Sequence, residues 1–295
     1  MSLPPPSENQ AYCTVSVLRA GFAQLPLARI LDSVTDPSEM IRAPCLSFLL
    51  RHSVSGDTFV FDLGLRKDWE TGLPPTQAAI IKQYFTVDIP EDVADSLQKG
   101  GLAPEQIAHV CISHMHFDHI GDTAPFTRAT FVVGAETRAL HTPGYPADPN
   151  GFVRSDVLPA GRTRYLERTE MRTPVGPFPH AYDWYGDGSL YLVDAPGHLP
   201  GQLTALVRTS ADGGWVFLVA DAAHDWRLIA GEAGIADSEH LGCMHQDKAT
   251  AAATIGKIQE VAQNPRVRVL LAHDTRWYEA NKDGNAFWPG SLESL

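Results

Sequence analysis

The sequence predicts an α/β layered fold, and two observations lead to this prediction. Short β-rich runs alternate with amphipathic helical segments along the chain, and several of the runs are almost continuously apolar. Apolar runs of this kind are typical of strands that are covered on both faces. Strands mixed throughout with helices are the pattern of layered α/β domains. With 295 residues, 44% of them hydrophobic, the chain can bury a substantial core.

Nine strands and two clear helices are expected. The helix at 90–101 opens with a proline and two acids and is followed by a glycine pair, and the helix at 247–263 is stopped by Asn264-Pro265. A Gly- and Pro-rich region from 142 to 189 predicts long loops. The expected strands are residues 12–18, 45–50, 58–61, 107–112, 130–133, 190–193, 203–207, 215–220 and 267–272.

One folded domain is expected, preceded by a short tail. Residues 1–10 combine three prolines with polar residues and offer little to bury, so they are predicted to be a mobile N-terminal tail. Residues 11–295 are then expected to form a single folded domain. The sequence leaves the oligomeric state open.

Charge and cysteine usage limit the classes of partner and the compartment. The chain carries 23 Lys and Arg against 35 Asp and Glu, a net charge of -12, which disfavours nucleic acid and anionic membranes as partners. A small-molecule substrate fits better. No apolar segment approaches the roughly 20 residues that span a bilayer, and the N-terminus does not resemble an export signal. Four scattered cysteines without a CxxC motif predict reduced thiols and a cytoplasmic protein, with no thiolate zinc site.

The stretch 111-CISHMHFDHIGD-122 places four potential metal ligands within six residues. They are His114, His116, Asp118 and His119, and they follow an apolar run that ends at Ile112. Loops at the carboxyl ends of buried strands are where α/β proteins present their chemistry. His114 and His116 can face one ion, and Asp118 and His119 can face a neighbouring one. Six residues cannot complete two coordination shells, so further ligands must come from elsewhere.

Three other predicted strands end at a residue of a metal-binding type. His198 follows the strand at 190–193, Asp221 ends the strand at 215–220, and His273 ends the strand at 267–272. Imidazole and carboxylate donors suit zinc and related divalent ions. A nitrogen and oxygen donor set that leaves positions open is typical of a catalytic metal site. The pattern therefore predicts a catalytic metal centre assembled from four strand ends.

These residues resemble the metallo-β-lactamase superfamily of hydrolases, because the HxHxDH motif and the three later ligands occur in the order and approximate spacing of that family. The resemblance implies an αββα sandwich, with two mixed β-sheets flanked by helices and a pair of metal ions at one edge of the sheets. It implies zinc as the first expectation, with manganese, iron and cobalt as alternatives. The ligands carried over are His114, His116 and His198 for one ion, Asp118, His119 and His273 for the second, and Asp221 as the bridge.

Four segments resemble the N-acyl homoserine lactonase-like branch: SHMHFDHIGD, DAPGHLPGQ, ADAAHDW and LLAHD. The branch implies opening of a lactone, or of a related lactam, by a metal-bridging hydroxide that attacks the ring carbonyl, with Asp118 among the catalytic residues. Such lactonases often carry a tyrosine three residues after the bridging aspartate, where this chain has His224. A histidine there can donate a hydrogen bond to a developing oxyanion or protonate the leaving group. A second-shell or surface position for His224 remains an alternative.

Two other functions stay open. One is a thioesterase of glyoxalase II-like or polyketide-releasing type, although the arginines between 162 and 172 do not make a convincing glutathione site. The other is a metal-binding relative without catalytic activity. No ligand of the set has been replaced, which argues against the second alternative.

Two further residues receive roles from their position. Asp62, in 58-TFVFDLG-64, matches an acidic residue that orients metal-bound histidines in this family, and a turn-forming aspartate is the alternative. Phe117 lies between two ligands, which predicts that it lines the substrate pocket. No role is assigned to the histidines without ligand spacing, which are His52, His109, His141, His180, His240 and His245.

Overall fold

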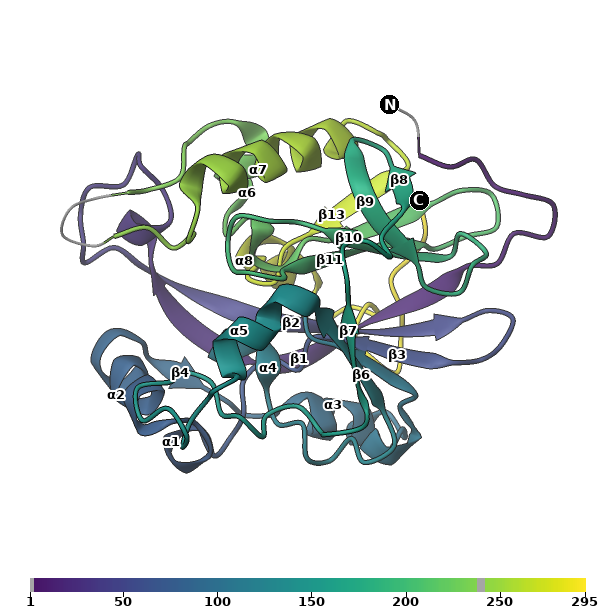
Figure 1. Ribbon diagram of the computed structural model, residues 1–295. Helices are drawn as coiled ribbons and strands as arrows, with labels where there is room; N and C mark the ends of the chain where they lie inside the picture. Colours follow the sequence, from purple (N-terminus) through teal and green to yellow (C-terminus); the bar gives the residue numbers. More distant parts are fainter. Residues whose placement is uncertain (1–2, 238–241) are drawn as a thin grey trace.

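Two β-sheets lie face to face with helices on their outer sides (Figure 1). This computed structural model describes residues 3–237 and 242–295, so His240 lies outside the described residues. The arrangement is the αββα sandwich expected from the resemblance, and that prediction is confirmed. In Figure 1, α7 (Lys248–Ala262) lies on the outside of one sheet at the top, and α3 (Val93–Lys99) lies below the other.

The first sheet has seven strands in the order β4-β1-β2-β3-β5-β6-β7. From β3 to β7 neighbouring strands are parallel, and the other pairs are antiparallel, so the sheet is mixed. Its strands are β1 (Cys13–Pro26), β2 (Met40–His52), β3 (Thr58–Phe61), β4 (Val87–Asp88), β5 (His109–Cys111), β6 (Thr130–Gly134) and β7 (Thr163–Leu166).

The second sheet has six strands in the order β13-β12-β11-β10-β9-β8. Only β12 and β13 pair in parallel. Because β11 is antiparallel to both of its neighbours, β10, β12 and β13 all run in the same direction. Their carboxyl ends therefore lie at one edge of the sheet. The strands are β8 (Thr173–Val175), β9 (Phe178–Asp183), β10 (Leu190–Asp194), β11 (Leu203–Arg208), β12 (Trp215–Leu218) and β13 (Val267–Leu270).

The remaining elements are short, apart from α2 and α7. The α-helices not yet given are α1 (Trp69–Gly72), α2 (Pro75–Tyr84), α4 (Phe117–Ile120), α5 (Arg138–His141), α6 (Trp226–Ala230) and α8 (Thr275–Asn281). The single-turn helices are η1 (Leu27–Arg29), η2 (Pro104–Gln106), η3 (Ala135–Thr137) and η4 (Ala220–Ala222). Among the described residues, no helix is both long and apolar enough to cross a membrane.

The strands are covered on both faces, as their apolar runs predict. In β3, Phe59 and Phe61 pack in the cluster between the sheets with Leu192 of β10, whereas Val60 packs in the cluster beneath the helices with Leu97 of α3. Side chains alternate between the faces of a strand, so consecutive apolar residues supply two hydrophobic layers. Because both faces of each strand are packed, the position and direction of the strand ends are fixed.

The structure corrects the prediction for residues 142–189. Three strands, β7, β8 and β9, lie within the region expected to form long loops. The prediction was wrong because these strands are short and β8 contains Pro174, which is tolerated there because β8 is an edge strand of its sheet. The expected strand at 215–220 ends at Leu218, and the next residues turn into η4.

Residues at the start of the chain contact the second sheet. The Arg208 side chain donates from Nη2 to the Pro4 carbonyl at 2.9 Å. Gln10 is buried and donates from Nε2 to the carbonyls of Ala11 at 2.8 Å and Asp187 at 2.7 Å. These bonds run from the first described residues to the end of β11 and the turn before β10.

Candidate metal centre

The seven residues of the HxHxDH motif and the later strand ends converge between the two sheets. The first sheet supplies His114, His116, Asp118 and His119, from the loop after β5 and the short helix α4. The second sheet supplies His198, Asp221 and His273, which follow β10, β12 and β13. Since these three strands run in the same direction, their carboxyl ends bring the three side chains to one edge of the sandwich.

Local backbone geometry positions several of these side chains. Gly197 has φ 129°, and a Cβ at this position would approach the backbone of Ala251 in α7 to 2.3 Å, so only glycine lets α7 pack against the loop that carries His198. Ala220 has φ 46°, a conformation that is uncommon for non-glycine residues, and it directly precedes Asp221. Backbone strain of this kind is frequently found at functional sites.

The first group of donors consists of three histidines. Nδ1 of His116 lies 3.0 Å from Nε2 of His114 and 2.9 Å from Nε2 of His198. Oδ2 of Asp221 lies 3.8 Å from Nε2 of His114 and 3.7 Å from Nε2 of His198. Ligand atoms of all four residues lie within 4.8 Å of one another, so a single ion can reach them.

The second group of donors surrounds the other oxygen of the same aspartate. Oδ1 of Asp221 lies 3.2 Å from Nε2 of His119 and 3.4 Å from Nε2 of His273. Nε2 of His273 also lies 3.4 Å from Oδ2 of Asp118. One carboxylate therefore presents one oxygen to each group, which is the arrangement of a bridging ligand between two ions.

Hydrogen bonds behind the donors fix their ring orientations. Asp62 accepts a hydrogen bond from the Ser113 backbone amide at 2.6 Å and one from the Ser113 hydroxyl at 2.8 Å, and its Oδ2 lies 2.8 Å from Nδ1 of His119. Nδ1 of His273 lies 2.9 Å from the Pro44 carbonyl. In both histidines Nε2 is thereby left for the centre. A carboxylate or carbonyl behind a histidine is the usual partner of a metal-bound imidazole.

The electrostatics of the two groups differ. Burial, reinforced by neighbouring histidines, lowers the pKa of His114 and His198 well below the usual value, so these rings are neutral and free to bind an ion. Burial alone would also lower the pKa of His119, but Asp221 and Asp62 raise it well above the usual value. The pKa of His273 is raised in the same way, mainly by Asp221, against the lowering effect of burial. The second group thus lies in a negative potential that favours a cation.

The donor set fits divalent metal ions. The side chains of His119 and Asp221 are almost fully buried, yet Nε2 of His119 and Oδ1 of Asp221 have no hydrogen-bond partner. Unsatisfied buried polar atoms are costly, and a cation placed between them would remove that cost. Mixed imidazole and carboxylate donors are those that zinc and related ions prefer.

His224 lies beside this centre. Its Nε2 is 3.3 Å from Oδ2 of Asp221, and neither ring nitrogen has a hydrogen-bond partner. His245, to which the sequence assigned no role, packs edge-on against His224 and His198, with ring centroids 4.9 and 5.1 Å away. The sequence gives no sign that His245 lies near the centre, because its spacing from the other histidines matches no ligand motif. The Gln246 amide donates to the His198 carbonyl at 3.0 Å, and this bond between distant segments brings His245 into place.

A cavity of about 410 Å³ opens onto the donors, a size suited to a small-molecule ligand. Phe117 lies in its wall and packs edge to face against Phe85, with ring centroids 5.6 Å apart. Phe85 and Phe152 also line it. The other apolar lining residues are Leu25, Ile80, Leu199, Cys243 and Met244.

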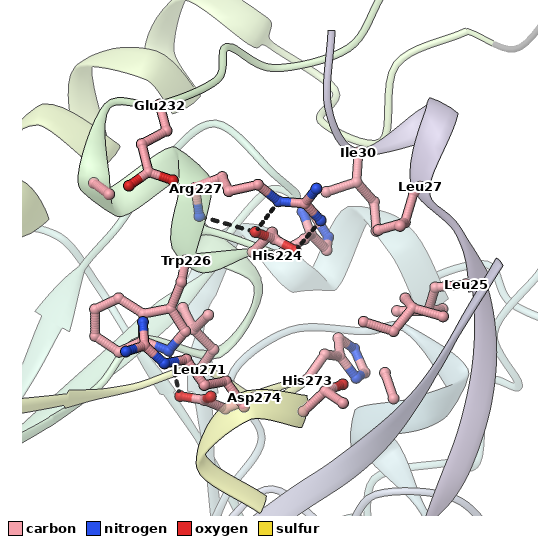
Figure 2. Close-up of a pocket in the computed structure, with 16 residues that line it drawn as sticks. Leu25, Leu27, Ile30, His224, Trp226, Arg227, Glu232, Leu271, His273 and Asp274 are labelled. Atoms are coloured by element: carbon pink, nitrogen blue, oxygen red, sulfur yellow. Dashed lines mark hydrogen bonds and ion pairs between the residues drawn. The ribbon is translucent and has the colours of Figure 1, made fainter. Parts of the chain in front are cut away.

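A second cavity, of about 390 Å³, adjoins the first and shares Leu25, His224 and His273 with it (Figure 2). Figure 2 shows Leu25, Leu27 and Ile30 on one side of this cavity and the α6 residues Trp226 and Arg227 opposite. Arg227 is paired with Asp225 at 2.9 Å, and Trp226 donates to Asp274 at 2.7 Å. The two cavities meet at His224 and His273, beside the donor groups.

Comparison with known proteins identifies the family to which a chain with this fold and this set of donors belongs. The sequence profile of the metallo-beta-lactamase superfamily matches residues 41–222. The chain belongs to this superfamily, as its motifs predict.

A gamma-lactamase and a metallo-hydrolase are among the curated relatives of this chain. Gamma-lactamase FDB1 of Fusarium pseudograminearum is 34% identical over 235 residues, which are 75% of this chain and 56% of the relative. Metallo-hydrolase mfmC of Annulohypoxylon moriforme is 40% identical over 196 residues, which are 64% of this chain and 50% of the relative. The chain thus spans about half the length of these curated relatives.

A solved structure shares the fold over almost the whole chain. It is an N-acyl homoserine lactone hydrolase with the product N-hexanoyl-L-homoserine bound at the catalytic metal center. Its TM-score is 0.72 at 18% sequence identity, and the alignment covers 96% of this chain and 98% of that one. At this identity the likeness shows the fold.

Proposed function

We propose that this chain is a dinuclear metal-dependent hydrolase that opens a lactone or a closely related lactam. The observation that carries the proposal is the position of Asp221, whose two oxygens each face a separate group of histidines. A γ-lactamase among the relatives and a lactone hydrolase among the similar folds support the substrate class.

The geometry supports one role for each ligand. His114, His116 and His198 would hold one ion, and Asp118, His119 and His273 would hold the other, with Asp221 shared between them. Zinc is the expected metal, and manganese, iron and cobalt remain alternatives. Two such ions supply an activated water at neutral pH and polarise the carbonyl that it attacks.

The chain's own side chains would orient the substrate and move its proton. His224 reaches the wall of both cavities, and neither of its ring nitrogens has a hydrogen-bond partner, so it can donate a hydrogen bond to the carbonyl oxygen as charge develops there. Asp118 lies in the cavity wall with its Oδ2 toward His273, where a carboxylate can pass a proton to the leaving group. Phe117, Phe85 and Phe152 would exclude water from the ring.

The setting of the protein is part of the same proposal. We place it in the cytoplasm as a single hydrolase domain, with a small molecule as its partner. All four cysteines are unpaired, which suits a reducing compartment, and the net charge of -12 disfavours nucleic acid.

The proposal is tested with purified protein, a panel of lactones and lactams of varied ring size, and a chelator. Ring opening should require metal and should stop on chelation. Asp221→Ala should lose bound metal and lower kcat/KM by more than ~100-fold, because the shared ligand is removed. Asp212→Ala, which changes an exposed carboxylate on a surface turn, is the matched control.

Two results would contradict the proposal. Metal-independent ring opening, or none across the whole panel, would remove the assigned reaction. Rapid hydrolysis of thioesters with negligible lactone opening would replace it with the thioesterase alternative.

A further inference from the structure

Cys45 lies beside the second group of donors. It belongs to β2, a strand that carries none of the predicted ligands, and it is 2% exposed. Its Sγ, a carboxylate oxygen of Asp118 and a ring nitrogen of His273 lie within 4.8 Å of one another. Over residues 3–237 and 242–295, no other cysteine joins a cluster of potential metal ligands.

Two hydrogen bonds hold Cys45 opposite His273. Nδ1 of His273 faces the Pro44 carbonyl at 2.9 Å, and the Leu46 amide donates to the Ala272 carbonyl at 2.9 Å. Residues 44 and 46 are thus both bonded to the segment 272–273. The residue between them is fixed against the imidazole, so the sulfur is placed by the backbone of β2.

The atoms around this sulfur point to a ligand. Nε2 of His119 and Oδ1 of Asp221 are buried without hydrogen-bond partners, and both face the space that Asp118 and His273 border. Donors of Asp118 and His273 therefore lie next to the thiol, and His273 also belongs to the group formed with His119 and Asp221. A thiol placed against such a set can become one more donor to the same ion.

We infer that Cys45 supplies its sulfur to the second ion, alongside Asp118, His119, Asp221 and His273. The inference rests on the metal centre proposed above. On binding, the S–H bond breaks, a sulfur–metal bond forms and the proton is released to solvent, so that the thiol and the dication yield a thiolate complex and one proton. No oxidant or reductant takes part.

Sulfur ligation would make the two sites of the centre chemically different. The first site has only nitrogen and oxygen donors, which suit manganese and zinc alike, whereas a thiolate favours softer ions. Zinc or cobalt should therefore be retained in the second site more strongly than manganese.

The test uses the full chain loaded with two equivalents of cobalt or zinc. Cobalt bound through Cys45 should give a thiolate-to-cobalt charge-transfer band in the near ultraviolet. X-ray absorption at the zinc edge should show a sulfur neighbour at about 2.3 Å in addition to nitrogen and oxygen at about 2.0 to 2.2 Å. The zinc measurement needs no variant, so it decides the question even if a variant fails to fold.

Two variants locate the sulfur. Cys45→Ser should lose the cobalt band and weaken binding of one ion on the order of 10- to 100-fold. Cys13→Ser, which changes a fully buried cysteine in the neighbouring strand β1, should keep both the band and the affinity.

The outcomes separate this inference from the proposed function. Two bound ions without any sulfur neighbour would overturn the role of Cys45 and leave the hydrolase intact. A wild-type protein that binds neither cobalt nor zinc would overturn both. A band that survives in Cys45→Ser would also contradict the assignment.

Discussion

Asp62 and His119 form a buried pair in which Oδ2 of the carboxylate lies 2.8 Å from Nδ1 of the imidazole. The opposite ring nitrogen, Nε2, lies 3.2 Å from Asp221. His119 is therefore held between a carboxylate that orients it and a carboxylate that would share its proposed cation. Asp62 adopts φ 62°, a left-handed conformation that aspartate and asparagine tolerate better than most residues.

Replacing Asp62 should weaken the metal centre without removing a ligand. Asp62→Asn keeps the size and the backbone conformation but removes the charge behind His119. We expect the affinity for one ion to fall about 10- to 100-fold, as for other partners of metal-bound histidines. Metal titration checks this, with Asp212→Asn as a surface control. Unchanged affinity would show that Asp62 only stabilises its turn.

His224 should contribute to turnover and not to metal content. His224→Phe removes both ring nitrogens and should lower kcat about 100-fold, the usual effect of losing one oxyanion donor or proton donor. His224→Tyr should retain part of the activity because its hydroxyl can donate. Steady-state kinetics and metal analysis are measured together. Loss of an ion in either variant would instead make His224 a ligand.

Phe117 should affect substrate binding more than the chemical step. Phe117→Ala removes an aromatic wall of the cavity and its contact with Phe85, so KM should rise about 10-fold while kcat changes little. Tyr84→Ala, at a half-exposed residue beside Phe85 that lies outside the cavity wall, is the control. A fall in kcat at constant KM would contradict a pocket role.

The metal-free protein should lose stability in mild acid through His245. Burial, reinforced by His224, holds the pKa of His245 at about 3, against about 6.5 in an unfolded chain. Between these values only the unfolded state binds the proton. The free energy of unfolding should therefore fall as pH drops below about 6.5, by up to ~1.4 kcal/mol per pH unit from this residue.

Urea unfolding of chelator-treated protein at pH 7.5 and pH 5 measures this dependence. His245→Gln should show a smaller loss of stability between the two pH values than the wild type. Equal losses in both proteins would show that His245 is already solvated or protonated in the folded state.

The convergence of the candidate metal ligands was predictable from the sequence because each candidate follows an apolar strand. His114 to His119 form one compact motif, Asp221 and His273 lie directly after recognisable apolar runs, and His198 follows such a run after a short turn. Strand direction then determines where they meet. The order of strands in each sheet was expected only through the resemblance, because apolar patterning does not specify which strands pair.

Other features of the site lacked any local signal. Cys45 and His245 reach the centre through backbone bonds between segments far apart in the chain, Leu46 with Ala272 and Gln246 with His198. Neither residue stands at a recognisable spacing from the motif. Strands β7, β8 and β9 were hidden by glycine and proline, which mark turns whether or not short strands lie between them.

Each group of donors takes side chains from both sheets. His114 and His116 come from the first sheet and His198 from the second, and Asp118 and His119 likewise face His273 across the sandwich. A bound ion would therefore connect two layers that are otherwise joined by apolar packing, by their connecting segments and by a few hydrogen bonds, such as that from the Leu46 amide to the Ala272 carbonyl. Removing the ion should weaken the association of the two sheets as well as stop turnover. Depletion of metal in the cell would then shorten the lifetime of the folded protein.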